Sequence, residues 1–205
     1  PYAPKGADWD RALAAWGNEF DGEREFSAQA DLGLHIIKTA VADKFDIAHS
    51  KMLPNEQGEG HAFGFVRRRL LNGKATPIVP IVQNTFYPPN QPLPERCFEF
   101  GESVRGAIDS WDSDARVCVL ASGGLSHFVV DENLDRGVIK ALTEKDHEHL
   151  KRLPPNLLNA GNSEIRNWIT ISATVQDKDM KLVEYVPCYR SPAGTGGGWA
   201  FAYWD

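Results

Sequence analysis

The chain has 205 residues, of which 42% are hydrophobic and 24% charged, a balance typical of a soluble protein with one well-filled core. Its formal net charge is −6, and its basic residues are scattered apart from the run 67–69, which argues against a nucleic-acid-binding protein. No apolar run approaches the ~18 residues of a membrane span and no signal-peptide pattern opens the chain, so we expect neither membrane insertion nor export.

Residues 1–30 show no clear apolar period, and we expect them to be irregular. From Asp31 onward, apolar residues recur at helical spacing, and short apolar runs rich in β-branched residues separate these stretches. In chain order, the patterns predict a helix over 31–41, a strand near 45–48, a helix through Phe65 and Leu70, a strand over 76–83, a helix over 93–108, a strand over 116–122, a helix capped by Asp131, a second helical segment to Leu150, a helix from Ser163, a strand over 183–189 and a last apolar run over 199–204. This alternation predicts an α/β fold, with one domain over 1–205 that has three layers, α/β/α, and a mostly parallel central sheet.

The segment 117–128 is the most informative part of the chain. An apolar run ends in Gly123-Gly124, and this tight turn presents His127, with Ser126 beside it. In open α/β sheets, ligands bind beyond the carboxyl ends of the strands, and histidine titrates near neutral pH. His127 is therefore the first catalytic candidate. The alternative is a structural histidine in a turn that requires glycines for its backbone angles.

Other polar residues are weaker candidates from their local pattern alone. Glu164 follows Asn162 and Ser163 at a predicted helix start, where a carboxylate offsets the helix dipole, so a structural role is favoured for it. His61 follows a Gly-Glu-Gly loop, and a surface role is about as plausible as a functional one. His49 is a reserve candidate at a strand end. The remaining histidines have charged or polar neighbours on predicted helices and are expected to be structural or solvated: His35, His147 and His149.

Two further patterns exclude other classes of site. The glycine-rich stretch 194–198 lacks the Lys and Ser/Thr of a phosphate-binding P-loop, and no apolar strand immediately precedes it. The three cysteines, Cys97, Cys118 and Cys188, are odd in number, far apart and in apolar surroundings, which favours reduced core thiols over disulfides or a CxxC metal site. We therefore expect a cytoplasmic protein.

From about His35 to its C-terminus, the chain resembles the class III extradiol ring-cleavage dioxygenases, the superfamily of the protocatechuate 4,5-dioxygenase β subunit. The resemblance rests on four ordered motifs: Glu59-Gly-His61, Asn84-Thr-Phe-Tyr-Pro-Pro, Gly123-Gly-Leu-Ser-His127 and Asn162-Ser-Glu164-Ile-Arg-Asn-Trp. It implies an Fe(II) ion held by two histidines and one glutamate, with open positions for a catechol and O₂. It assigns the glutamate ligand to Glu164, the acid/base histidine to His127, and a second active-site histidine that is not an iron ligand to His61.

The resemblance has further implications for the whole protein. Both iron-binding histidines of the family fall before Pro1, so the 205 residues of this chain would correspond to the C-terminal two-thirds of such an enzyme. The product would be a ring-opened hydroxymuconic semialdehyde-type acid, and His61, Ser126 and Asn84 would contact the substrate. The resemblance also implies a homo-oligomer, with or without a small companion subunit.

Two readings from other functional classes stay open on the sequence. The chain could be a metal-free relative that keeps the fold and acts as a binding or scaffold protein, because Glu164 alone cannot make an iron site. It could also be a metal-dependent hydrolase that uses His49, His61 and Glu164, although these residues show no recognised ligand spacing. Two histidines near strand ends upstream of Pro1 would favour the dioxygenase.

Overall fold

The computed structural model describes residues 27–51, 60–71, 74 and 76–205, which divide into two compact units. The first unit takes its described residues from 1–34 and 48–81, and the second comprises 35–47 and 82–205. Helix α2 (Ala30–Ala42) contributes to both units and confirms the helix predicted over 31–41. Most of the stretch expected to be irregular, residues 1–26, lies outside the described residues.

Among its described residues, the first unit contains little regular structure beyond its part of α2. Helix α3 (His61–Phe65) continues into a π-helical turn, η1 (Val66–Leu70), which confirms the helix predicted through Phe65 and Leu70. A single parallel bridge joins Ala28 to Ile78, next to a hydrogen bond from the backbone N–H of Gln29 to the carbonyl oxygen of Ile78 (3.2 Å). Among the residues described in this unit, that bridge is the only strand-like pairing.

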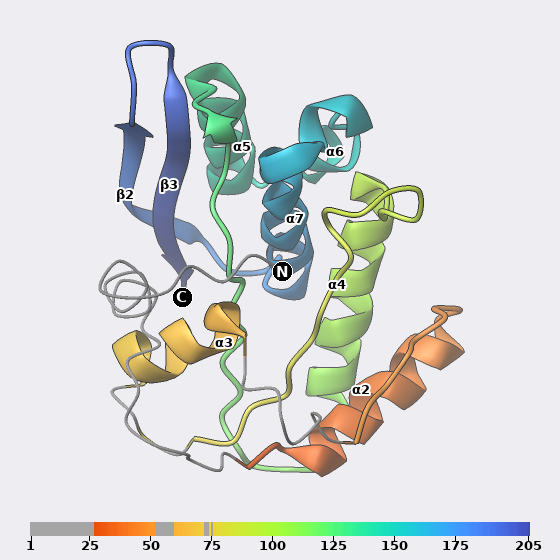
Figure 1. Ribbon diagram of the computed structural model, residues 1–205. Helices are drawn as coiled ribbons and strands as arrows, with labels where there is room; N and C mark the ends of the chain where they lie inside the picture. Colours follow the sequence, from red (N-terminus) through yellow and green to blue (C-terminus); the bar gives the residue numbers. More distant parts are fainter. Residues whose placement is uncertain (1–26, 52–59, 72–73, 75) are drawn as a thin grey trace. The chain divides into compact units, whose positions relative to one another are not determined.

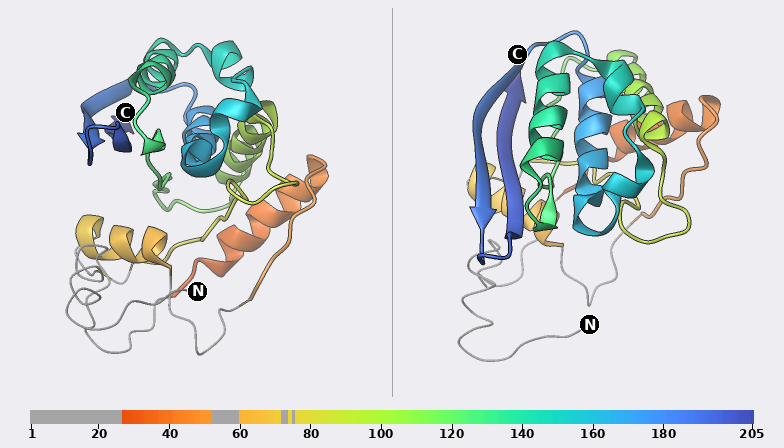
Figure 2. Two further views of the ribbon diagram at one scale, coloured as in Figure 1. Left: turned by 45° about the horizontal axis from the view of Figure 1, so that its top comes forward. Right: turned by 90° about the horizontal axis from the view of Figure 1, so that it is seen from above.

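In the second unit, two long helices lie side by side and carry much of the core (Figures 1 and 2). They are α4 (Pro94–Asp109) and α7 (Ile165–Thr174). They approach closely at Gly101, where an added Cβ would overlap the carbonyl oxygen of Thr170. The core includes fully buried residues from α4, the 123–127 turn, α5, α6, the 155–158 turn and α7: Cys97, Leu125, Val138, Leu150, Leu158, Ile165 and Ile169.

The helices between α4 and α7 follow the sequence closely. The Asp131 carboxylate accepts a hydrogen bond from the backbone N–H of Leu134 and caps α5, as predicted. Pro154 and Pro155 end the next helical segment, as their ring geometry requires. The elements in this stretch are α5 (Glu132–Glu144), α6 (His147–Lys151), and the 3₁₀ turns η2 (Pro155–Leu158) and η3 (Ala160–Glu164).

The sheet of the second unit is antiparallel, with strand order β1-β3-β2. Its strands are β1 (His127–Val129), β2 (Met180–Tyr189) and β3 (Thr195–Trp204). His127 lies opposite Gly197, so 195–198 of the glycine-rich stretch form the beginning of β3, and the strand starts four residues before the predicted apolar run over 199–204. Alternate residues of β3 pack on the core, namely Ala200, Ala202 and Trp204.

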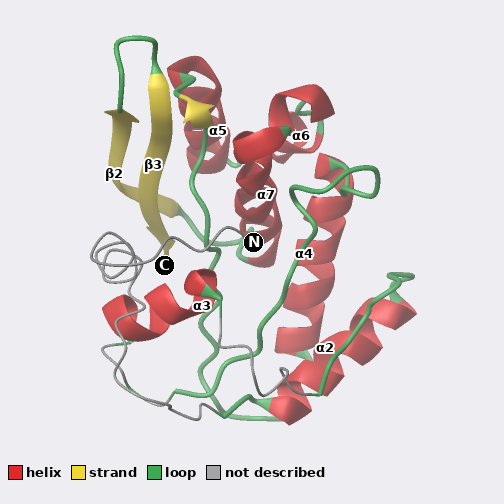
Figure 3. Ribbon diagram, viewed as in Figure 1, coloured by secondary structure: helices red, strands yellow, loops and turns green. Residues whose placement is uncertain are grey.

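The expected mostly parallel, three-layer sheet is not found in the described residues, which instead form a mixed α/β fold. Three predicted strands, 45–48, 76–83 and 116–122, are loops there apart from the Ile78 bridge (Figure 3). An apolar run forms a strand only where a neighbour pairs with its N–H and C=O groups, and Pro77 and Pro80 have no N–H to offer. Leu120, predicted in a buried strand, is instead 50% exposed. Within the described residues, no helix combines the length and apolar character needed to cross a membrane.

Candidate active site

The turn before β1 brings two glycines against functional side chains. Gly123 has a φ of 146°, and an added Cβ there would lie 2.9 Å from the Cβ of Glu164. At Gly124, an added Cβ would lie 2.5 Å from Cε1 of His127. Both positions therefore require glycine, because of the backbone angle at the first and the close approach at the second. The two glycines are therefore needed for the backbone conformation of the turn and for the close approach of Glu164 and His127 to it.

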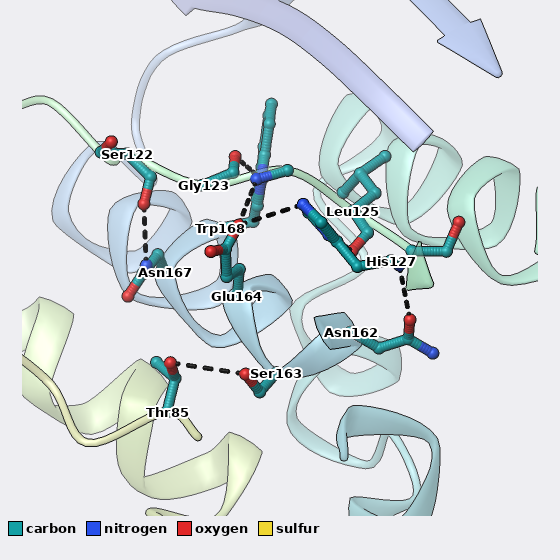
Figure 4. A network of polar contacts seen from close by, with 12 residues as sticks. Thr85, Ser122, Gly123, Leu125, His127, Asn162, Ser163, Glu164, Asn167 and Trp168 are labelled. Carbon is teal, nitrogen blue, oxygen red and sulfur yellow. Dashed lines mark hydrogen bonds and ion pairs between the residues drawn. The ribbon is translucent and has the colours of Figure 1, made fainter. Parts of the chain in front are cut away.

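His127 is held at both its backbone and its ring (Figure 4). Its backbone N–H donates to Oδ1 of Asn162 (2.8 Å), and its Nδ1 lies 3.1 Å from the carbonyl oxygen of Leu125. A carbonyl oxygen can only accept, so this contact favours the tautomer with the proton on Nδ1. Nε2 is then unprotonated in the neutral ring, and it lies 3.7 Å from Oε2 of Glu164. This geometry makes Nε2 the atom that can accept a proton.

Glu164 lies at the junction of η3 and α7, and it makes no side-chain cap hydrogen bond to the helix. Its Oε2 accepts a hydrogen bond from the backbone N–H of Gly124 (2.7 Å). Glu164 is therefore at a helix start, as expected, but its carboxylate bonds to the 123–127 turn instead of capping the helix. Its side chain is 40% exposed, so the carboxylate can reach a ligand.

Asn167 and Trp168 of α7 hold the turn in place. The sequence placed both in the last of the four motifs but predicted no role for either. Nε1 of Trp168 donates to the carbonyl oxygen of Gly123 (3.1 Å), and Nδ2 of Asn167 donates to that of Ser122 (2.9 Å). Asn167 and Trp168 follow Glu164 by three and four positions, so all three share one helical face. That spacing is a signal by which the sequence could have pointed to them.

The other predicted substrate-binding residues have different surroundings. The Asn84 amide bonds within its own loop, to the backbone of Tyr87 (2.7 and 3.0 Å) and to Oδ1 of Asn90 (2.7 Å). Ser126 is fully buried, and its hydroxyl donates to Asp135 (2.7 Å). His61 is the first residue of α3 in the other compact unit, and it is exposed. Substrate contacts by these three residues stay predictions.

A pocket of about 470 Å³ opens beside His127, in the size range of small-molecule sites. The Trp199 ring lies edge-on to the His127 ring, with centroids 5.5 Å apart. The pocket lies against β1 and the β2–β3 hairpin and is lined by His127, Phe128, Cys188, Tyr189, Arg190 and Trp199. His127 thus lines the pocket while its Nε2 lies near Glu164.

The cysteines differ in their exposure. Cys118 and Cys188 are exposed and only Cys97 is buried, so the expectation of core thiols holds for one of the three cysteines.

The described residues supply only part of a metal site. Glu164 offers a carboxylate, of which Oε2 accepts the hydrogen bond from the Gly124 N–H. However, no three His, Cys, Asp or Glu side chains in the described part of the chain are grouped to hold a metal ion. These residues do not by themselves fit the two-histidine, one-carboxylate set that binds non-haem iron.

Comparison with known proteins identifies the family. Residues 16–196, a range that contains both His127 and Glu164, match the model of the catalytic LigB subunit of aromatic ring-opening dioxygenase. The chain belongs to this family. A gallate dioxygenase from Pseudomonas putida is 32% identical over 105 residues, a match that covers 50% of this chain and 30% of that relative. The chain therefore spans well under two-thirds of the relative's length. Membership of the LigB family confirms the resemblance noted in the sequence.

Proposed function

We propose that this chain carries the acid/base part of an Fe(II)-dependent extradiol dioxygenase, which opens a catecholic ring next to the diol and inserts both atoms of O₂. Membership of the LigB family supports the reaction class. The observation that carries the proposal is the position of His127, whose Nε2 lies 3.7 Å from the Glu164 carboxylate and which lines a pocket of about 470 Å³, large enough for a single aromatic ring.

In this proposal, the two residues have separate tasks. Glu164 is one ligand of the iron, and the remaining ligands come from residues other than those described. His127 accepts a proton from a substrate hydroxyl at Nε2 and returns it later in the reaction, while the Leu125 carbonyl holds Nδ1. A positioned acid/base of this kind contributes ~10²–10⁴-fold to a rate. His61, Ser126 and Asn84 are proposed as substrate-binding residues, the last two with their side chains already bonded internally.

The proposal extends to the setting of the enzyme. The chain acts on a small catecholic molecule and O₂ in the cytoplasm, without a nucleic-acid or membrane partner. It forms a homo-oligomer, with or without a small companion subunit, as the resemblance to class III enzymes implies.

Because the other ligands come from residues outside those described, the deciding experiment is an anaerobic Fe(II) titration of the intact natural protein, followed by O₂ uptake with a panel of catechols that includes protocatechuate and gallate. We expect stoichiometric iron and iron-dependent uptake that yields a yellow ring-opened product. Absence of iron binding by the intact protein would refute the proposal and favour the metal-free binding or scaffold protein.

Variants separate the two tasks. His127→Phe should keep iron and lower turnover by ~10²-fold or more. His149→Phe, at an exposed position of α6, is the matched control and should leave turnover unchanged. Glu164→Ala should empty the iron site. Glu164→Gln removes the charge but keeps an oxygen that can accept from Gly124, so it should lose iron while the turn stays in place. Retained stoichiometric iron in either Glu164 variant would show that this residue is not a ligand.

A further inference from the structure

A buried carboxylate lies behind the histidine turn. Asp135 of α5 has no exposed surface, and its carboxylate accepts three hydrogen bonds. Oδ1 accepts from the backbone N–H of Ser126 (2.8 Å), and Oδ2 accepts from the hydroxyls of Ser126 (2.7 Å) and Tyr185 (2.8 Å). In the described part of the chain, no ion pair involves Asp135, so its charge is balanced by neutral donors.

Packing alone does not explain a carboxylate at this position. Asp135 lies on the buried stripe of α5 that also contains Val138 and Leu142, at a position where an aliphatic side chain would be the simpler choice. Burying a charge is costly unless donors satisfy it, and here three donors do so. Burial, together with the hydrogen bond to Asp135, raises the pKa of Tyr185 above its usual value, which keeps this hydroxyl protonated as a donor.

The backbone on the other side of the turn is also tightly held. The backbone N–H of Gly198 in β3 donates to the carbonyl oxygen of Ser126 (2.7 Å), and the N–H of Leu125 donates to the carbonyl oxygen of Gly198 (2.9 Å). A Cβ at Gly198 would overlap the Asp135 carboxylate, so glycine at this position lets the carboxylate approach. Residues 125 and 126 are thus enclosed between α5 and β3.

One planar group connects Asp135 to the histidine. The N–H of the Leu125–Ser126 peptide unit donates to Asp135 Oδ1 (2.8 Å), and its carbonyl oxygen lies 3.1 Å from Nδ1 of His127. Because a peptide unit is rigid and planar, fixing its N–H also fixes the direction of its C=O. A hydrogen bond from the N–H to a charged acceptor also polarises the peptide and makes its carbonyl oxygen a better acceptor.

We propose that Asp135 is a positioning residue that acts through the Leu125–Ser126 peptide to hold His127 in the tautomer with Nδ1 protonated and Nε2 free. Its benefit to catalysis rests on the proposed function, whereas its effect on the tautomer does not. Asp135 itself touches neither the pocket nor the reacting atoms.

The test is ¹⁵N NMR of the histidine rings in the 205-residue chain, under alkaline conditions where imidazoles are neutral. His127→Phe identifies the His127 signals. In the wild type, we expect the proton on Nδ1. In Asp135→Ala, the Ser126 N–H loses its acceptor, so the peptide is no longer held and the Nδ1–H to Nε2–H ratio should fall about fivefold, the effect of losing one neutral hydrogen bond. The signals of His149 should stay unchanged.

Two companion variants distinguish this mechanism from a general loss of structure. Asp135→Asn keeps an oxygen that can accept from the Ser126 N–H, and the Ser126 and Tyr185 hydroxyls can accept from its NH₂, so it should leave the tautomer ratio within about twofold of the wild type. Ser126→Ala removes the hydroxyl but keeps the hydrogen bond from the backbone N–H to Asp135, so it should leave the ratio unchanged. If Asp135→Ala does not fold, Asp135→Ser, which leaves room for water, takes its place.

Several results would overturn the inference. One is a wild-type His127 that carries its proton on Nε2, and another is an unchanged ratio in a folded Asp135→Ala or Asp135→Ser protein. In an active enzyme, Asp135→Ala should lower kcat at least threefold while KM for the catechol stays within twofold, because Asp135 does not line the pocket. If the wild type opens no ring, the proposed function fails while the NMR comparison still decides the role of Asp135.

Discussion

Substituting Gly124 by alanine should displace His127 without straining the backbone. Gly124 lies outside the left-handed region, so alanine can adopt its angles. The added methyl would lie 2.5 Å from Cε1 of His127 and 3.2 Å from both Nε2 and the carbonyl oxygen of Gly198. Non-bonded carbon atoms separate to ~3.5 Å, so the ring must move by about 1 Å.

Movement of the whole side chain is restricted, because Gly161 lies so close to the Cβ of His127 that an added Cβ there would overlap it. A misplacement of about 1 Å at a reacting group can cost ~10²-fold in rate. We therefore expect Gly124→Ala to lower kcat for ring opening by ~10²-fold, with iron content equal to that of the wild type. The assay is O₂ uptake at saturating substrate, with iron measured on the same sample.

Gly137→Ala is the matched control, since Gly137 is interior to α5 and an added Cβ would meet no atom within 4 Å. It should leave kcat unchanged and raise the free energy of unfolding by about 0.5–1 kcal/mol, because alanine is the better helix former. A folded Gly124→Ala protein with kcat within twofold of the wild type would refute the placement of His127 in the reaction.

Three further predictions concern stability and reactivity. Arg166 is 2% exposed and its guanidinium donates to three backbone carbonyls, so Arg166→Met should lower the free energy of unfolding in urea by about 3 kcal/mol, and a loss below ~1 kcal/mol would contradict this account. Burial raises the pKa of the Cys97 thiol to about 12, so a thiol reagent at neutral pH should modify exposed Cys118 and Cys188 quickly and Cys97 only after unfolding; three fast thiols would be the contrary result. Burial lowers the pKa of the His147 ring in the folded chain, so the unfolded chain binds a proton there at a higher pH than the folded chain does. The free energy of unfolding should therefore fall as the pH drops below about 6.5. His147→Gln should remove that part of the pH dependence, and an equal slope in both proteins would rule it out.

The helices could be predicted because local spacing decides them. The apolar period of α4 and the capping aspartate of α5 are visible within one or two helical turns. The strands were harder to predict. Residues 116–122 have the composition of a strand but no partner among the described residues, whereas 195–198 are poor strand formers and still pair along β1 and β2.

The candidate site divides in the same way. His127 could be selected from its own turn, since Gly123 and Gly124 come shortly before it and both prove to be required by the geometry. The local pattern favoured a structural role for Glu164 at a helix start, and its actual contact is the N–H of Gly124, 40 positions earlier in the chain. Only the resemblance to a family pointed to Glu164 from the sequence.

By itself, the sequence determined the helices of the second unit, the turn that carries His127 and, through its ordered motifs, the family. The tertiary structure decided which strands form, where the Glu164 carboxylate points, and that a buried Asp135 holds the peptide next to His127. The reason is physical: helical periodicity and turns depend on neighbours within a few residues, whereas strand pairing and buried hydrogen bonds depend on groups that only folding brings together.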